Sequence, residues 1–131
     1  MDVTKKERDC IVVIHENSSG FPLRLSDIAS LMKVKPSTAY ELLNRLLSKK
    51  IITKEKGMIM PTQYGNRVYS EIITAHRTME ILLTKSGVNR DIACSQMEKI
   101  DYLMDELSVE KILKQIGNPD KCPHGKPVKP V

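Results

Sequence analysis

Hydrophobic positions recur every three or four residues through the first fifty residues of this chain, which is the spacing of amphipathic helices. The pattern predicts helices over residues 4–16, 26–32 and 36–50. Ser26 is the expected N-cap of the second helix, because its hydroxyl can accept a hydrogen bond from the first turn. Pro36 suits the start of the third helix, because its fixed φ angle is already helical. A tight turn therefore joins the last two helices.

After residue 50 the pattern changes to two short β-prone runs. Residues 51–53 and 58–60 flank a charged turn that contains Gly57, which predicts a β-hairpin. Two helices joined by a tight turn form a helix-turn-helix, whose second helix enters the major groove of DNA. With the hairpin as its wing, residues 1–62 are expected to form a winged helix-turn-helix DNA-binding domain.

The second half of the chain returns to helical spacing. The expected elements are helices over residues 62–85, 90–107 and 108–117 and an irregular, proline-rich tail over 118–131. Thr62 and Asn89 are the expected caps of the first two. Their apolar stripes are long for so small a domain, so residues 63–131 are expected to form a helical dimerisation domain. The alternative is that they complete the core of a monomer. Either way the fold is predicted to be mainly α-helical.

Composition narrows the class of protein. Hydrophobic residues make up 40% of the chain and charged residues 28%, with no tryptophan and one phenylalanine, so the core is expected to be aliphatic. No apolar run approaches the roughly 20 residues of a membrane helix, and no signal-peptide pattern opens the chain. We therefore expect a cytoplasmic protein without a membrane partner. Three cysteines do not form a disulfide framework and are expected to be core residues, free thiols or metal ligands.

Positive charge is concentrated in the predicted DNA-binding segment. The net charge is +5, and residues 33–56 carry seven Lys and Arg against two Asp and Glu. Charge alone would equally fit a solvated lysine face, but within a helix-turn-helix it favours double-stranded DNA as the partner. The residues expected to contact bases or backbone are Ser37, Thr38, Tyr40 and Asn44. The residues expected to contact phosphates are Lys35, Arg45, Lys49, Lys54 and Lys56.

Candidate metal ligands lie along the helices of the second half. Cys94, Glu98 and Asp101 are spaced at i, i+4 and i+7, which places them on one face of the helix expected over 90–107. His76 and Glu80 lie four apart on the preceding helix and could face them if the two helices pack as an antiparallel pair. Thiolate, imidazole and carboxylate suit a divalent transition ion better than Ca²⁺ or Mg²⁺. The alternative is that the acidic residues face solvent and Cys94 belongs to the core.

Six short segments in order along nearly the whole chain carry a more specific signal. They are LSDIA (25–29), KPST (35–38), PTQYG (61–65), AHRTME (75–80), MEKID (97–101) and NPDKCPHGKPV (118–128). Together they resemble the diphtheria-toxin-repressor family of iron- and manganese-dependent regulators, in its short form without an SH3-like domain. The resemblance implies a homodimeric transcriptional repressor that binds a DNA operator. It implies Fe²⁺ or Mn²⁺ as cofactor, with Zn²⁺ as an alternative, and neither enzymatic activity nor a small-molecule substrate.

The resemblance also assigns metal ligands by position. They are Asp9, His76, Glu80, Cys94, Glu98 and Asp101. Tyr102 departs from the family, which has a histidine there, and a phenol is a poor ligand for Mn²⁺ or Fe²⁺ near neutral pH. Val12 stands where manganese-dependent members have a second carboxylate. We therefore expect one site to survive, formed by His76, Glu80, Cys94 and Glu98, with the thiolate favouring softer ions such as Fe²⁺ or Zn²⁺. Cys122 and His124 either add ligands or only pack.

Three other functions remain open. Tyr102 is consistent with a winged-helix regulator that has lost metal control. A winged helix can also serve as a protein-interaction adaptor without DNA. A small metal-dependent hydrolase is disfavoured, because the sequence offers neither a nucleophile–base pair nor a glycine-rich phosphate loop.

Overall fold

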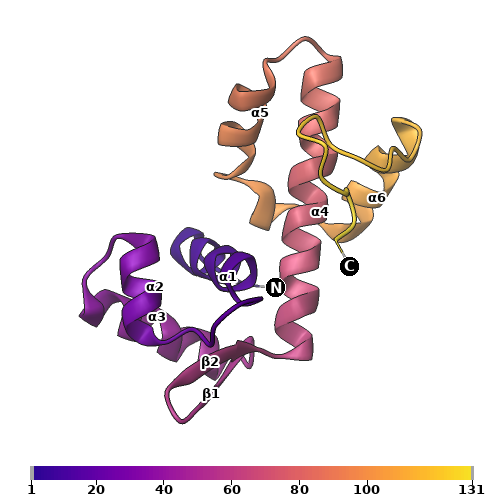
Figure 1. The fold of residues 1–131 in the computed structure, drawn as a ribbon. Coiled ribbons are helices and arrows are strands. Elements are labelled where there is room, and N and C mark those ends of the chain that lie inside the picture. Colours follow the sequence, from indigo (N-terminus) through magenta and orange to yellow (C-terminus); the bar gives the residue numbers. More distant parts are fainter. Residues whose placement is uncertain (1, 131) are drawn as a thin grey trace. The chain divides into compact units, whose positions relative to one another are not determined.

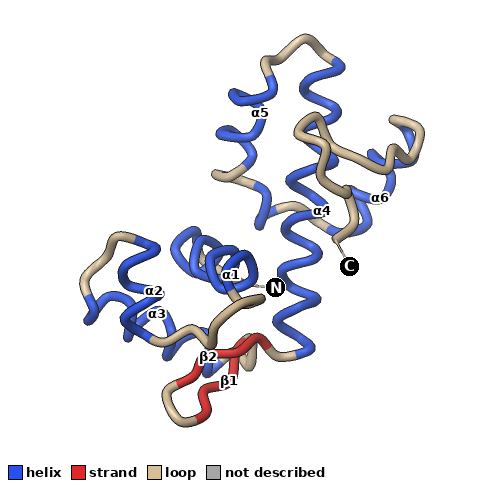
Figure 2. Tube along the Cα trace, in the orientation of Figure 1, coloured by secondary structure: helices blue, strands red, loops and turns tan. Residues whose placement is uncertain are grey.

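The computed structural model describes residues 2–130 and contains, in that range, six α-helices, one 3-10 helix and a two-stranded β-sheet (Figures 1 and 2). The chain is mainly helical, as predicted, and divides into two compact units, Met1–Tyr69 and Ser70–Val131. Helix α4 (Gln63–Lys85) contributes its first residues to one unit and its remainder to the other. Within residues 2–130, no helix has both the length and the hydrophobicity needed to cross a membrane.

The first unit has the winged helix-turn-helix arrangement that the sequence predicts. Its elements before α4 are α1 (Lys5–Asn17), α2 (Leu25–Met32), α3 (Pro36–Ser48), β1 (Ile52–Glu55) and β2 (Met58–Pro61). The three helices pack on one another, and the hairpin packs against α1 and α3. Its largest fully buried side chains are aliphatic and include Ile11, Ile14, Ile28, Leu46 and Ile51. The aliphatic core follows from a sequence almost free of aromatic residues.

The starts of α1 and α2 are fixed by local hydrogen bonds. Thr4 and Glu7 form a capping box, in which each side chain accepts from the other residue's backbone N–H. The prediction of Ser26 as N-cap of α2 is wrong, because the N-cap is Arg24. Its backbone N–H donates to the Asp27 carboxylate at 2.9 Å. A hydrogen bond to a carboxylate is stronger than one between neutral groups, and the N-cap lies two residues before the predicted one.

The hairpin is tied to the segment that precedes α2. Lys56 and Gly57 have φ angles of 51° and 81°, both in the left-handed region that a two-residue type I′ turn requires. The Arg24 side chain donates to the carbonyl oxygen of Lys56 at 3.1 Å. The Ile59 N–H donates to the carbonyl oxygen of Leu23 at 2.7 Å. These contacts hold the wing in place at both its tip and its second strand.

Helix α4 starts where its first turn passes close to the backbone of Ile51. Thr62 accepts a hydrogen bond from the Gly65 N–H at 2.9 Å, so it caps the helix as predicted. The Thr62 hydroxyl also lies 2.6 Å from the carbonyl oxygen of Lys50. A Cβ atom at Gly65 would lie 2.0 Å from the carbonyl oxygen of Ile51. Only glycine fits the first turn of α4 at this distance.

The second unit corrects one predicted element. The single helix expected over 90–107 is wrong, because α5 (Arg90–Met97) ends ten residues early and is followed by the 3-10 helix η1 (Asp101–Leu103). Ile100 interrupts the helix with φ −137° and ψ −5°. This break turns Asp101 into the interior, where it is 1% exposed. There the Asp101 carboxylate hydrogen-bonds to the ring of His76, which lies 25 residues earlier in the chain. This contact gives a physical reason for the break.

The remaining elements of the second unit are α6 (Glu106–Gln115) and a packed tail. α6 begins after Asp105, which accepts from the Ser108 N–H at 3.0 Å, two residues before the predicted start. The tail packs on α4 and α6 through a buried cluster. Its members are Ile81, Leu113, Cys122 and Val128, with Ile116 packed against them. The Arg77 side chain also donates to the carbonyl oxygen of Pro127 at 2.6 Å.

Candidate metal centre and DNA-binding surface

His76 is the centre of a buried polar cluster in the second unit. Helix α4 places Glu80 one turn after His76, and His76 Nε2 lies 3.0 Å from Glu80 Oε1. Cys94 on α5 brings its Sγ to 3.4 Å from the same nitrogen. The other ring nitrogen, Nδ1, lies 2.9 Å from Asp101 Oδ2. Both ring nitrogens of one histidine are thus engaged, one by two potential metal ligands and one by a carboxylate.

The electrostatics of the cluster favour a positive charge at His76. Burial lowers the pKa of His76, but hydrogen bonds to Asp101, Glu80 and Cys94 outweigh it and raise the pKa to about 10. Burial likewise raises the pKa of Glu80, but the hydrogen bond and charge of His76 and the charge of His124 outweigh it and lower the pKa overall. At neutral pH a proton on His76 therefore balances the buried carboxylates. A divalent cation bound to Nε2 would supply the same compensation.

Two groups of side chains in the described residues have the spacing of metal ligands. The first is His76, Glu80 and Cys94, whose ligand atoms all lie within 4.8 Å of one another. The second, within the same limit, is Glu80, Cys122 and His124. Sequence reasoning named the first group but left the second open, because the partner of a tail residue cannot be read from spacing. Glu80 belongs to both groups.

The structure does not gather all the predicted ligands into these groups. Glu98 is exposed at the C-cap of α5 and belongs to neither group among the described residues. Asp101 contacts His76 as a hydrogen-bond partner. Asp9 lies in the first unit, where its carboxylate pairs with Lys5 at 2.5 Å and with Arg8 at 3.1 Å. The ligand roles of Glu98, Asp101 and Asp9 therefore stay predictions.

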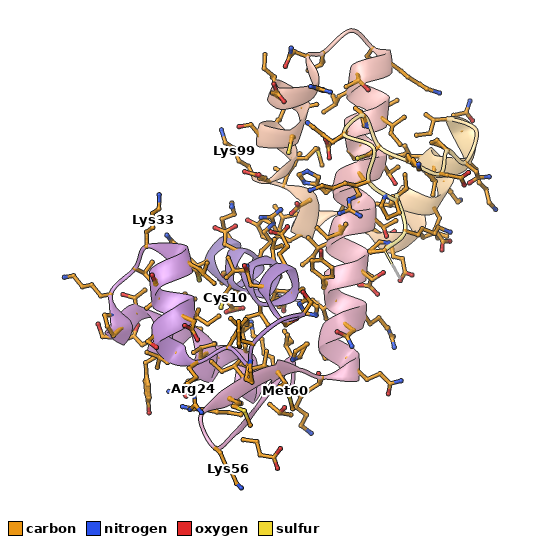
Figure 3. The ribbon with its side chains drawn as sticks, viewed as in Figure 1. Cys10, Arg24, Lys33, Lys56, Met60 and Lys99 are labelled. Carbon is orange, nitrogen blue, oxygen red and sulfur yellow. The ribbon has the colours of Figure 1, made fainter. Side chains whose placement is uncertain are left out.

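The first unit presents the residues predicted to contact DNA. Thr38 is half-buried and the others are exposed. The exposed ones are Lys35, Ser37, Tyr40, Asn44, Arg45, Lys49, Lys54 and Lys56. The Tyr40 side chain is 50% exposed, which is unusual for a large aromatic residue on a packed helix. Figure 3 shows Lys56 extending from the tip of the hairpin and Lys33 from the end of α2. Sequence reasoning did not name Lys33 as a contact.

Lys49 is an exception among the predicted phosphate contacts. Its ammonium lies 2.5 Å from the Glu7 carboxylate, which is 1% exposed, and it also donates to the backbone oxygen of Asp2 at 2.6 Å. A buried carboxylate needs such a partner. Lys49 therefore stabilises the fold through these contacts and is less free than the other lysines to bind phosphate.

Comparisons with known proteins agree with this geometry. Residues 62–130 match the family described as "Iron dependent repressor, metal binding and dimerisation domain". The chain is 28% identical over 121 residues to an uncharacterised HTH-type transcriptional regulator of Aeropyrum pernix, covering 92% of this chain and 67% of the relative.

Two solved structures extend the likeness to the whole chain. The crystal structure of the hypothetical protein SSo2273 from Sulfolobus solfataricus superposes with a TM-score of 0.86 at 31% identity, covering 98% of this chain and 100% of the other. That of T. acidophilum IdeR gives 0.72 at 26% identity, covering 100% of this chain and 65% of the other. A family match over more than half of the sequence, joined to a winged helix-turn-helix, settles the class of protein. The chain belongs to the iron-dependent repressor family and is a metal-dependent helix-turn-helix transcriptional repressor.

Proposed function

We propose that this repressor acts as a homodimer whose affinity for a double-stranded DNA operator rises when a divalent transition ion binds His76, Glu80 and Cys94. The observation that carries the proposal is the convergence of an imidazole, a carboxylate and a thiol within 4.8 Å on one side of α4. Fe²⁺ and Mn²⁺ are the ions proposed first, and Zn²⁺ is the alternative.

The donor set fits such an ion. Ligand atoms that share one ion at about 2.0–2.3 Å lie roughly 3–4 Å from one another. The distances from His76 Nε2 to Glu80 and to Cys94 are 3.0 and 3.4 Å, so little movement is needed. A thiolate beside imidazole and carboxylate favours Fe²⁺ or Zn²⁺ over harder ions. Bound there, the ion would supply the positive charge that a proton on His76 otherwise provides.

Asp101 has a distinct role in this proposal. Its hydrogen bond to Nδ1 leaves Nε2 as the ring nitrogen that faces Glu80 and Cys94. Metal-binding histidines commonly donate their second N–H to a carboxylate, which fixes the ring and makes it a better ligand. Asp101 would therefore position His76 rather than bind the ion directly.

The dimer is proposed to form through the second unit. Ile92, Ile100, Leu103 and Leu107 are 61%, 42%, 67% and 59% exposed, and all lie within sixteen residues of the chain. Exposed large aliphatic residues in one short segment mark an interaction surface, and a second copy is the partner that a dimerising family predicts. Two recognition helices can then address two half-sites one turn of DNA apart. Ile92→Lys should give monomers in sedimentation experiments and abolish specific DNA binding. Gln115→Lys, an exposed change on α6 outside this segment, should do neither.

Metal would act on DNA binding by linkage. An ion that binds the DNA-competent arrangement more tightly shifts the population towards it, by no more than the difference in its affinities for the two arrangements. Within each protomer α3 would read bases through Ser37, Thr38, Tyr40 and Asn44. Lys54 and Lys56 of the wing would contact phosphates.

A metal-independent regulator is the second candidate, because His76, Glu80 and Asp101 already satisfy one another without an ion. The deciding experiment selects a duplex from a random pool in the presence of Mn²⁺ or Fe²⁺ and measures its binding by fluorescence anisotropy at fixed salt. We expect the ion to tighten binding, a chelator to reverse this, and His76→Ala to abolish it. Gln115→Ala, an exposed change on α6, should leave the response intact. Equal affinity with ion, with chelator and in His76→Ala would establish the metal-independent regulator.

A further inference from the structure

Helix α3 carries an acidic side chain at the centre of its exposed face. The buried side of the helix is formed by Ala39, Leu42, Leu43 and Leu46. Glu41 lies four residues after Ser37 and three before Asn44, so these three side chains form one stripe on the opposite side. All three are exposed. Glu41 therefore faces the same way as two of the residues proposed to contact bases.

The Glu41 carboxylate has no partner within the part of the chain that the structure describes. Arg45 follows four residues later, which is the spacing at which a glutamate and a following basic residue pair most readily on a helix. No ion pair joins the two side chains, and no hydrogen bond of the Glu41 carboxylate is present within residues 2–130. Both of its oxygens are therefore free to accept hydrogen bonds from a bound molecule.

A carboxylate at this position weakens binding to most DNA sequences. Residues 33–56 carry seven Lys and Arg against two Asp and Glu, and the two acidic residues are Glu41 and Glu55. Phosphates repel a carboxylate, and so do the acceptor atoms that guanine and thymine present in the major groove. A side chain that is repelled by most sequences but accepted by a few increases the specificity of binding. Glu41 therefore needs a base with a hydrogen-bond donor.

Cytosine is the base that fits a carboxylate best. It presents its N4 amino group in the major groove, and glutamate and aspartate accept a hydrogen bond from it. Adenine also presents an amino group, but its acceptor atom N7 lies beside that group. We propose that Glu41 reads one cytosine in each half-site of the operator by accepting a hydrogen bond from N4. This inference rests on the proposed function, because Glu41 reaches a base only if α3 lies in the major groove. The competing account is a solvated Glu41 that contacts no base.

Selection of duplexes from a random pool, in the presence of Mn²⁺ or Fe²⁺, distinguishes these accounts. The parent should select cytosine at one position of each half-site, and Glu41→Gln should select adenine there, because an amide pairs with N6 and N7 of adenine. The other positions should not change. Glu55→Gln is the matched control, because it removes the same charge outside α3. It should tighten binding to every duplex without changing the selected sequence.

Anisotropy titrations on the selected duplex measure the size of the effect. Replacing the cytosine pair by T·A should weaken binding of the parent about 5- to 150-fold, the range expected for a base contact. N4-methylcytosine at the same position places a methyl group where the carboxylate would lie, so it should also weaken the parent. Glu41→Ala should bind all three duplexes with nearly equal affinity.

The outcomes separate the inference from the proposed function. If the parent and Glu41→Gln select the same sequence, Glu41 reads no base and the inference is wrong, although α3 still reads the operator. A base other than cytosine at the position that changes would also overturn it. If Glu41→Ala binds every duplex more tightly and keeps the preference of the parent, repulsion is the only role of Glu41. A parent that selects no preferred sequence would contradict both the inference and the proposed reading of bases by α3.

Discussion

The two units of this chain bury different chemistry. In the first, the interior is almost entirely aliphatic, and the buried charged residues, Glu7 and Arg8, are paired with Lys49 and Asp9 nearer the surface. In the second, His76, Glu80 and Asp101 are buried together, and both carboxylates contact the His76 ring. The first unit is thus held by apolar packing. The second adds to its apolar core a buried polar cluster whose carboxylates need a cation, either a proton or a metal ion.

We propose that this difference separates metal sensing in the second unit from DNA contacts in the first. Apolar packing depends little on protonation or on metal, so we expect the stability of the winged helix to respond less to either than that of the second unit. The stability of the buried cluster around His76 changes when its proton is lost or replaced by a metal ion. The reason is that a buried carboxylate without a compensating positive charge is costly. A metal-responsive repressor needs both properties. The substitutions below test whether metal-independent stability and cation-dependent stability belong to different units.

The largest expected effect concerns the core of the first unit. Leu46 is fully buried, so Leu46→Ala should lower the free energy of unfolding by about 2–5 kcal/mol. Leu31→Ala is the matched control, since Leu31 is 46% exposed and its truncation should cost far less. Hydrogen exchange of the amides in α1 to β2 measures the effect. The decrease in the free energy of unfolding should be the same with and without metal. A decrease that depends on metal would contradict the separation of the two units.

A second change tests the close contact between the first turn of α4 and the backbone of Ile51. Gly65→Ala places a methyl group against the carbonyl oxygen of Ile51, so it should cost about 1–3 kcal/mol, as overpacking usually does. Gly20→Ala is the control, because a Cβ atom there has no neighbour within 4 Å among the described residues. Thermal unfolding should show a lower Tm for Gly65→Ala alone. Equal Tm values for the two variants would contradict the packing described here.

A third prediction concerns pH and applies to the second unit. Because the pKa of His76 is raised from 6.5 to about 10, its contribution to the stability of the metal-free protein is complete below pH 6.5. It is lost as the pH rises through 10. Because the pKa of Glu80 is lowered from 4.5, its contribution is present above that value and lost at lower pH. Hydrogen exchange in α5 and η1 should therefore accelerate in alkali after correction for the intrinsic pH dependence.

Metal affinity should respond to pH in the opposite direction. Binding displaces the proton of His76, and a thiol ligand must also shed its proton, so affinity should rise at least about tenfold per pH unit between roughly pH 7 and 9, which corresponds to about 1.4 kcal/mol per unit for each proton released. Competition with a fluorescent chelator measures this slope in the parent and in His76→Gln. A parent whose metal affinity is independent of pH in this range would show that the ion does not replace that proton.

The smallest effect concerns the wing. Lys54→Glu and Lys56→Glu should weaken binding to every duplex and reduce the slope of log affinity against log salt by about 0.9 per lost phosphate contact. Tyr40→Ala should instead change sequence preference, since a base contact contributes about 1–3 kcal/mol of discrimination. Both are read from anisotropy titrations on several duplexes. Neither change should alter metal affinity in the absence of DNA.

How much the sequence predicts also differs between the units. The elements of the first unit follow from periodicity, Pro36, Thr62 and the turn at Gly57, because each signal is local. In the second unit, local periodicity predicts one helix over 90–107, and the break after Met97 comes from the buried contact between His76 and Asp101. The pairing of Glu80 with His124 spans 44 residues and leaves no local trace. The ligand types and the group on the two helices could thus be predicted, but the group that includes the tail depends on tertiary structure.

The most direct test of the account is a closed thermodynamic cycle between metal and DNA. Calorimetry gives the affinity of the dimer for Mn²⁺ or Fe²⁺ with and without operator, and anisotropy gives its affinity for operator with and without the ion. The account predicts that the gain in metal-binding free energy, summed over both protomers, equals the gain in DNA-binding free energy, with a coupling of about 1–3 kcal/mol. The coupling should disappear in His76→Ala. Equal metal affinity with and without operator in the parent, or the same coupling in His76→Ala, would contradict it.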